Sequence, residues 1–165
     1  MKLPIIHFKG FHFPLFPRLW PVRGVMASFR FTESCRYNLD NGDQFDWNKL
    51  CGVNFTLPGQ PLKAVMLGWR YDPESDYIVI APYINDPELG RMMFPPLARV
   101  LIGYSFPVRI SRTKSGRWRF AAFINDEWQE EFYEVSFKNE WGRDVAGWYG
   151  GNRPAPHFIK IERVA

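Results

Sequence analysis

The sequence predicts an all-β protein, a two-sheet antiparallel β-sandwich or jelly roll, and three observations support that prediction. From Ala27 onward apolar and polar residues alternate with a period of two, which is typical of half-buried strands. Turn-forming residues are frequent between the alternating runs, with 13 glycines and 14 prolines in 165 residues. Helical periodicity is nearly absent. A chain of this length with 46% hydrophobic residues can bury one core, so we expect eight to ten strands in one domain.

The expected elements follow from where the alternation runs and where it breaks. A strand is expected over 27–32, and a hairpin joins 63–71 to 76–83 around a turn at Asp72–Ser75. A second hairpin joins 108–110 to 118–122 around residues 113–116. Three further strands are expected over 133–137, 145–150 and 158–163, and one short turn of helix over 43–50, capped by Asp43.

The first 23 residues form an extended, basic arm that precedes the sandwich domain of residues 24–165. Four prolines exclude a regular helix in this arm and disfavour a central strand. Its five aromatic side chains favour burial against another surface, so we expect the arm to lie in a groove, either on a neighbouring subunit or on its own domain. Disorder of the arm is the third alternative. The aromatic side chains are Phe8, Phe11, Phe13, Phe16 and Trp20.

The net charge of +4 resides in the arm, which has Lys2, Lys9, Arg18 and Arg23 and no acidic residue. The remainder of the chain is neutral, so it lacks the basic stripe that nucleic-acid binding requires, and no nucleic-acid partner is expected. No apolar run is long enough to span a bilayer, so no membrane span is expected.

Cys35 and Cys51 have no CxxC spacing and are expected to be partly buried thiols. Pro4, His7 and Lys9 interrupt any apolar segment near the start, so no signal peptide is expected. A virion or a cytoplasmic location both stay open.

Recognisable catalytic motifs are absent, including the nucleophile elbow, the Walker loop and the dinucleotide fingerprint. Two weaker constellations remain: a carboxylate pair for glycoside hydrolysis, and a lyase set of Tyr149 with Arg153 and His157. The carboxylates are Asp126, Glu127, Glu130 and Glu131, in a segment that we interpret as a polar connection between strands.

No metal site is expected from the three histidines, His7, His12 and His157, because none has a zinc-like spacing. The turn over 40–46 offers oxygen ligands for calcium, although an Asx-rich turn explains the same residues. No cofactor is otherwise predicted.

The aromatic content, 18% of the chain, is larger than a small core needs. Aromatic rings beside amide and guanidinium groups suit the faces of sugars, and equally suit a protein interface. The candidate ligand-binding residues are Trp128, Trp141, Tyr149, Asn152 and Arg153.

The segment Gly147–Ile161 resembles the closing loop and last strand of concanavalin A-like jelly rolls, the superfamily of lectins, glucanases and polysaccharide lyases. The hairpin over 108–123 is similar to paired strands of that fold. The sequence lacks both the Glu-x-Asp-x-Glu strand of retaining glucanases and the Tyr-x-Lys-x-Tyr strand of many lyases of this shape. Segments 45–50 and 68–71 resemble small bacterial and phage proteins, which implies no activity.

Two functional hypotheses follow. The first is a non-catalytic module that docks through its arm into a larger assembly, such as a virion or a cell-surface complex, and binds glycan or protein. The alternative is a carbohydrate-active enzyme on the same fold, either a polysaccharide lyase or a glycoside hydrolase.

Overall fold

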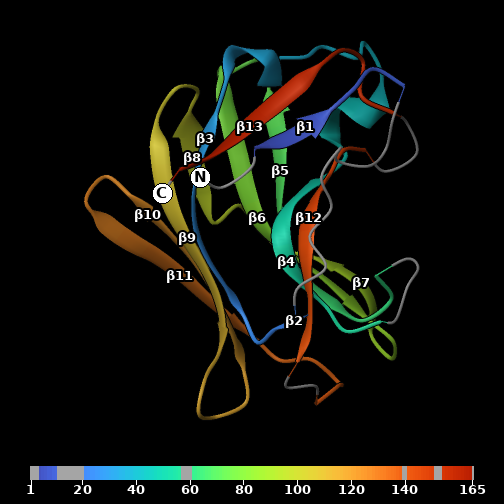
Figure 1. Cartoon of the computed structure of the whole chain (residues 1–165), viewed down its shortest axis with the longest axis vertical. Coiled ribbons are helices and arrows are strands. Elements are labelled where there is room, and N and C mark those ends of the chain that lie inside the picture. Colours follow the sequence, from blue (N-terminus) through green and yellow to red (C-terminus); the bar gives the residue numbers. More distant parts are fainter. Residues whose placement is uncertain (1–3, 11–20, 57–60, 139–140, 151–153, 165) are drawn as a thin grey trace.

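The structure is a computed structural model, and it describes residues 4–10, 21–56, 61–138, 141–150 and 154–164 (Figure 1). Two antiparallel sheets lie face to face, with a few 3-10 turns and no α-helix in these residues. The all-β sandwich expected from the sequence is confirmed. The alternating side chains can be buried on one face only if a second sheet covers that face, which explains the two-layer architecture.

Sheet A has six strands in the order β1-β13-β3-β9-β10-β11, all paired antiparallel. Their bounds are β1 Ile5–His7, β13 Ile159–Val164, β3 Val25–Phe31, β9 Ser105–Arg112, β10 Trp118–Ile124 and β11 Glu127–Tyr133.

Sheet B has seven strands in the order β2-β12-β4-β5-β6-β7, with β8 also paired to β6. Their bounds are β2 Pro21–Val22, β12 Gly142–Trp148, β4 Asn48–Asn54, β5 Ala64–Asp72, β6 Tyr77–Asp86, β7 Gly90–Met93 and β8 Ala98–Leu101.

The core between the sheets is rich in aromatic residues. Phe31 of β3 stacks on Phe106 of β9 with ring centroids 5.7 Å apart, and it meets Trp69 of β5 across the sandwich at 5.1 Å. All three side chains are almost completely buried. Each removes a large apolar area from water, so this cluster contributes much of the free energy that holds the two sheets together.

The two predicted hairpins are confirmed, with β5 paired to β6 and β9 paired to β10. A third hairpin joins β10 to β11 through Asn125 and Asp126, whose φ angles of 52° and 64° are those of a tight two-residue turn. Residues 126–131 are therefore mostly strand β11 and not the connection expected from their polarity.

The strand expected over 133–137 is wrong, because β11 ends at Tyr133. Ser136 is held by side-chain bonds: its backbone N–H and its hydroxyl both donate to the carboxylate of Asp86, at 2.6 and 2.5 Å. The alternating pattern there reflects Phe137 packing into the core without a strand partner.

The helix expected over 43–50 is shorter than predicted. A single 3-10 turn covers Gly42–Phe45, and its cap is Asn41, whose side chain accepts from the Asp43 N–H at 2.9 Å. The chain then enters β4 at Asn48, because residues 48–54 pair with β5 on one side and β12 on the other.

Both described ends of the arm belong to the protein's own sheets. β1 pairs with β13, and β2 pairs with β12. Phe8 follows β1 and contacts Phe158 edge to face, with centroids 5.7 Å apart. Phe11, Phe13, Phe16 and Trp20 lie outside the described residues.

Cys35 and Cys51 are both buried thiols, as expected, and no disulfide joins them. Burial raises the pKa of Cys35 to about 12, so this thiol stays protonated and unreactive at neutral pH. In the described part of the chain, no helix is long and apolar enough to cross a membrane.

Candidate functional site

The outer face of sheet B, which points away from the sandwich core, carries side chains that are unusual for a solvent-facing sheet. Met66 of β5 and Tyr83 of β6 are directly opposite each other in the register and are buried, with Ala64 beside them. They form an apolar cluster that is separate from the main core, and Trp47 and Val145 pack against it. We call this surface, together with Lys49 and Arg91, the Lys49 face.

Lys49 of β4 places its ammonium group over the ring of Tyr83, 4.6 Å from the ring centroid. The same Nζ donates to the backbone carbonyl of Trp47 at 3.0 Å. Burial, and secondarily the positive charge of Arg91, lower the pKa of Lys49 to about 8, while Asp46 opposes that shift. An amine with a pKa near 8 is partly unprotonated at neutral pH, which is the property required of a general base.

Tyr83 is 3% exposed, and burial raises the pKa of its hydroxyl, an effect that Arg91 opposes. Arg91 lies on β7 opposite Asn85 of β6, two residues from Tyr83 on the same face. A neutral phenol, an amine and a guanidinium group thus share one patch of the sheet.

A second group of side chains extends this face. The guanidinium carbon of Arg70 lies 4.8 Å from the ring centroid of Trp47 and 5.6 Å from that of Phe45. One of its nitrogens donates to the Phe45 carbonyl at 3.2 Å, and Phe45 itself is 62% exposed. An arginine held between two aromatic rings offers both an apolar platform and a charged donor.

The chemistry of this face suits an acidic sugar. Guanidinium groups form bidentate hydrogen bonds with carboxylates, and aromatic rings contact the apolar faces of pyranose rings. Neither Arg70 nor Arg91 forms an ion pair with an acidic residue of the described chain. Both guanidinium groups therefore keep their charge available for a ligand.

Of the residues predicted from sequence to bind ligand, the three that the structure describes do not all lie on one surface. Trp128 lies in β11 of sheet A and not in a loop, while Trp141 precedes β12 of sheet B and is 55% exposed. Tyr149 belongs to the main core, where it packs on Tyr37 and Trp69, so it does not fit the expected surface role. Asn152 and Arg153 lie outside the described residues.

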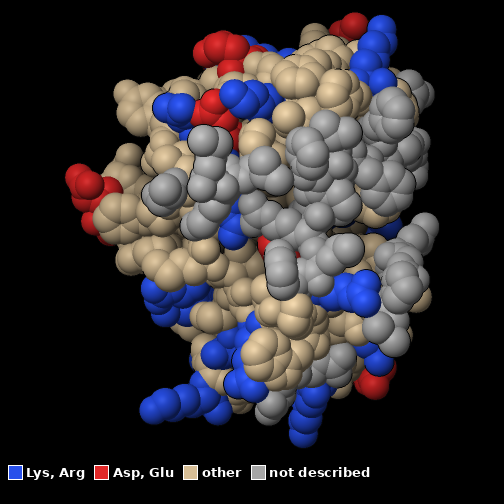
Figure 2. Space-filling model, in the orientation of Figure 1, with Lys and Arg blue, Asp and Glu red and all other residues tan. Residues whose placement is uncertain are grey.

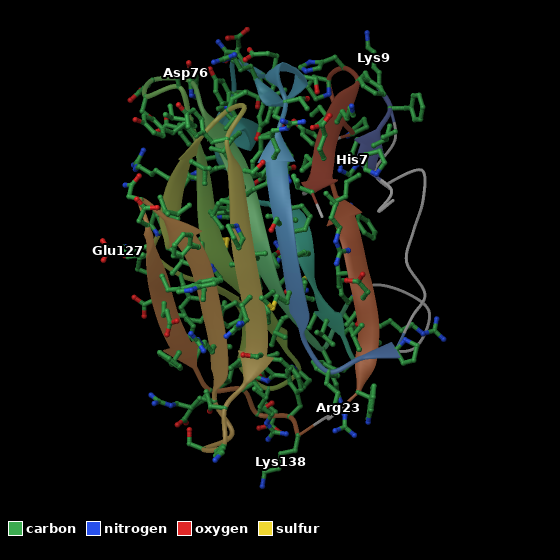
Figure 3. The ribbon with its side chains drawn as sticks, turned by 60° about the vertical axis from the view of Figure 1, so that its left-hand side comes forward. His7, Lys9, Arg23, Asp76, Glu127 and Lys138 are labelled. Carbon is green, nitrogen blue, oxygen red and sulfur yellow. The ribbon has the colours of Figure 1, made fainter. Side chains whose placement is uncertain are left out.

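Several described members of the catalytic constellations considered from sequence have structural partners or point away from the sandwich, and Arg153 lies outside the described residues. Glu130 forms an ion pair with Arg119, and Glu127 projects outward at the β11 edge of sheet A (Figure 3). Burial, with the neighbouring Tyr37, raises the pKa of Tyr149, and a phenol so placed is a poor base. A ring nitrogen of His157 lies 2.8 Å from the Ser34 carbonyl oxygen, so this imidazole already has a structural hydrogen-bond partner.

Within the described residues, no three His, Cys, Asp or Glu side chains are grouped so that they could hold a metal ion. Of the turn over 40–46, Asn41 caps the 3-10 helix, and the Gln44 amide bonds to the Tyr71 carbonyl at 3.0 Å. The calcium interpretation of this turn stays a prediction.

Residue spacing in the sequence does not point to the Lys49 face. Lys49 and Tyr83 are 34 residues apart in the chain, and only the pairing of β4, β5 and β6 brings them together. One signal was present: β5 and β6 are apolar at nearly every position, which indicates that both faces of these strands are covered.

Comparison with known proteins finds matches among solved structures. An alginate lyase from Pseudomonas aeruginosa superimposes with a TM-score of 0.52 at 14% identity, over 88% of this chain and 62% of that enzyme. The alginate lyase Aly36B superimposes with a TM-score of 0.51 at 12% identity, over 98% of this chain and 78% of the enzyme. No family model and no curated protein matches the sequence.

These likenesses define the class of fold. The chain has the concanavalin A-like jelly roll that alginate lyases share, as the C-terminal resemblance implied. It spans 62% of the length of the Pseudomonas enzyme. Identities this low establish the fold alone, so activity must be argued from the site.

Proposed function

We propose that this protein is a carbohydrate-active enzyme that cleaves an acidic polysaccharide by β-elimination on the Lys49 face. The observation that carries the proposal is Lys49, an amine with a pKa of about 8 placed over Tyr83 and beside Arg91. The fold shared with two alginate lyases supports it and favours this alternative over a non-catalytic assembly module. Nothing in the fold or its neighbours points to a virion.

The proposed reaction uses three side chains. Arg91 pairs with the uronate carboxylate and so acidifies the C5–H bond next to it. The neutral amine of Lys49 takes the C5 proton, a C4–C5 double bond forms, and the bond from C4 to the glycosidic oxygen breaks. The hydroxyl of Tyr83 donates its proton to the departing oxygen, which leaves one new chain end and one unsaturated uronate.

The resting state returns when the Lys49 ammonium gives its proton to the Tyr83 phenolate. The Lys49 Nζ lies 4.6 Å from the centroid of the Tyr83 ring, and one bridging water carries the proton from the amine to the phenolate. The raised pKa of Tyr83 keeps its hydroxyl protonated before each turnover, as a general acid requires.

Neighbouring sugars would lie along the same face. Arg70, held between Phe45 and Trp47, can pair with the carboxylate of an adjacent uronate while the rings contact its apolar face. A polysaccharide with one carboxylate per sugar can then pair successive carboxylates with Arg91 and Arg70 along the sheet.

The test is a panel of acidic polysaccharides, including alginate and polygalacturonate, with the ultraviolet absorbance of unsaturated uronates as the readout. We expect activity from the natural sequence and a loss of about 100-fold or more in both Lys49→Met and Tyr83→Phe, because each removes a proton-transfer group. Lys114→Met, in the exposed β9–β10 turn on the other sheet, is the matched control and should keep full activity.

Two results would contradict the proposal. Equal rates for Lys49→Met and Lys114→Met would remove Lys49 from the reaction. New reducing ends without ultraviolet absorbance would indicate hydrolysis in place of elimination.

A further inference from the structure

A second basic and aromatic surface lies on sheet A, away from the Lys49 face. A groove of about 650 Å³ opens between the start of β3 and the end of β9, with the buried Trp118 among its lining residues. Its rim carries three arginines, Arg23, Arg109 and Arg112. We call this surface the Arg109 groove. In Figure 3, Arg23 lies at the lower end of the sandwich, beyond the end of β2.

Tryptophans hold two of these arginines. The guanidinium carbon of Arg23 is 4.1 Å from the ring centroid of Trp141, and that of Arg109 is 5.4 Å from that of Trp128. Arg109 also lies opposite Met26, which is 64% exposed, and donates to its sulfur at 3.7 Å. The groove therefore alternates apolar surface with fixed positive charge.

The arginines of the groove differ from others on the same sheet. Arg30 and Arg119 each form an ion pair, with Glu162 and Glu130. Within the described chain, no acidic residue pairs with Arg23, Arg109 or Arg112. Figure 2 shows Lys and Arg gathered over the lower part of the molecule, the end that holds the β9–β10 turn in Figure 1.

We propose that the Arg109 groove binds a stretch of an anionic polysaccharide as a second, non-catalytic site. Each guanidinium group without an acidic partner in the described chain would take one uronate carboxylate, and Trp128, Trp141 and Met26 would contact the sugar faces. The choice of a uronate polymer rests on the proposed function. Charge complementarity selects an anionic chain, and the neutral balance of residues 24–165 favours a sugar polymer over a nucleic acid, which needs a broader basic surface.

The experiment measures binding and cleavage separately. Alginate and polygalacturonate are titrated calorimetrically into the full chain, its Arg23→Gln/Arg109→Gln variant and the control Arg99→Gln, whose guanidinium pairs with Asp72 on sheet B. If the natural protein degrades the polymer, all three are made in the Lys49→Met background. Melting temperatures confirm that each variant is folded.

We expect the double variant to bind the long polymer at least about tenfold more weakly, because a charge-assisted hydrogen bond contributes about that factor or more. Arg99→Gln should bind normally. Initial cleavage of trimers, measured with Lys49 left intact, should be unchanged by the Arg23→Gln/Arg109→Gln substitutions. Loss of polymer binding in a protein without lyase activity would support the groove while refuting the proposed function.

Three results would overturn the proposal. The first is that the double variant binds both polymers as tightly as the control. The second is that the natural protein binds no acidic polysaccharide, and the third is that a short DNA duplex competes more strongly than either polymer. Unchanged binding by the double variant together with intact cleavage would refute the groove alone.

Discussion

The two outer faces of the sandwich both combine cations with aromatic rings, but they differ in the kind of cation and in what surrounds it. Lys49 lies against the buried Tyr83, and its pKa is lowered into the range where it can exchange a proton. The arginines of the Arg109 groove lie against exposed side chains such as Trp141 and Met26. Burial thus distinguishes a face suited to proton transfer from one suited only to holding an anion.

The largest effect that would test this comparison is the pH dependence of cleavage. Lys49 must be unprotonated to act as the base, so the rate should rise about tenfold per pH unit below a pKa of about 8 and level off above it. Lys49→Arg keeps the charge but cannot lose it, so the rate should fall by about 100-fold or more at every pH. Initial rates between pH 6 and 9.5 measure this, and a profile flat through pH 8 would remove Lys49 as the base.

The acid limb of that profile must be separated from unfolding, and His7 of β1 allows this. His7 is completely buried, neither ring nitrogen has a hydrogen-bond partner among the described residues, and burial lowers its pKa from 6.5 to about 4. Between these values the unfolded chain binds more protons than the folded one, so the free energy of unfolding should fall by about 3 kcal/mol as pH drops from 6.5 to 4.

His7→Leu should abolish most of that acid sensitivity, as urea unfolding at pH 7 and pH 4.5 would show. His157→Leu is the matched control, because His157 is partly exposed. If His7→Leu and the natural protein lose the same stability in acid, another group causes the loss.

A smaller effect should follow from Gly52, which lies on the Lys49 face. A Cβ at this position would come within 2.4 Å of the Val65 carbonyl oxygen and 2.6 Å of the Met66 side chain. Gly52→Ala should therefore cost about 1–3 kcal/mol of stability and reduce cleavage, while binding at the Arg109 groove persists. Gly42→Ala, where an added Cβ meets nothing, is the control. Thermal melts and calorimetry measure both, and equal melting temperatures would contradict the close approach.

The smallest expected effect contrasts the two kinds of cation directly. Lys49 has a lowered pKa because burial disfavours its charge, so Lys49→Met should stabilise the protein at pH 7. The gain should be slight, because the variant also loses the contacts of Nζ with the Tyr83 ring and the Trp47 carbonyl. That gain should vanish as the pH rises through about 10.5, where the lysine of the unfolded chain also loses its proton. Arg109→Met should change stability little at either pH. Urea unfolding of both variants at pH 7 and above pH 10 tests this, and destabilisation by Lys49→Met at pH 7 would refute it.

Much of the fold could be predicted from local sequence. The alternation of Phe29 and Phe31, and the turn chemistry after Tyr71 and Ser111, act between residues close in the chain. The segment around Val135 misled the prediction, because Phe137 packs into the core while Ser136 bonds to Asp86, 50 residues away, instead of pairing in a strand. The candidate site was harder to predict from the sequence. Residue type alone pointed to Trp128, Trp141 and Tyr149, whereas the burial of each depends on how distant strands pair.

The sequence alone determined that this protein is an antiparallel β-sandwich, because side-chain period and turn residues are local properties. It also determined that the surplus of aromatic residues and arginines could serve sugar recognition. The tertiary structure decided which of them meet: strand pairing carried Lys49 to Tyr83 and Arg109 to Trp128. The pKa of Lys49 depends on what covers it and on the charge of Arg91 across the sheet, and both are set only when distant strands pair.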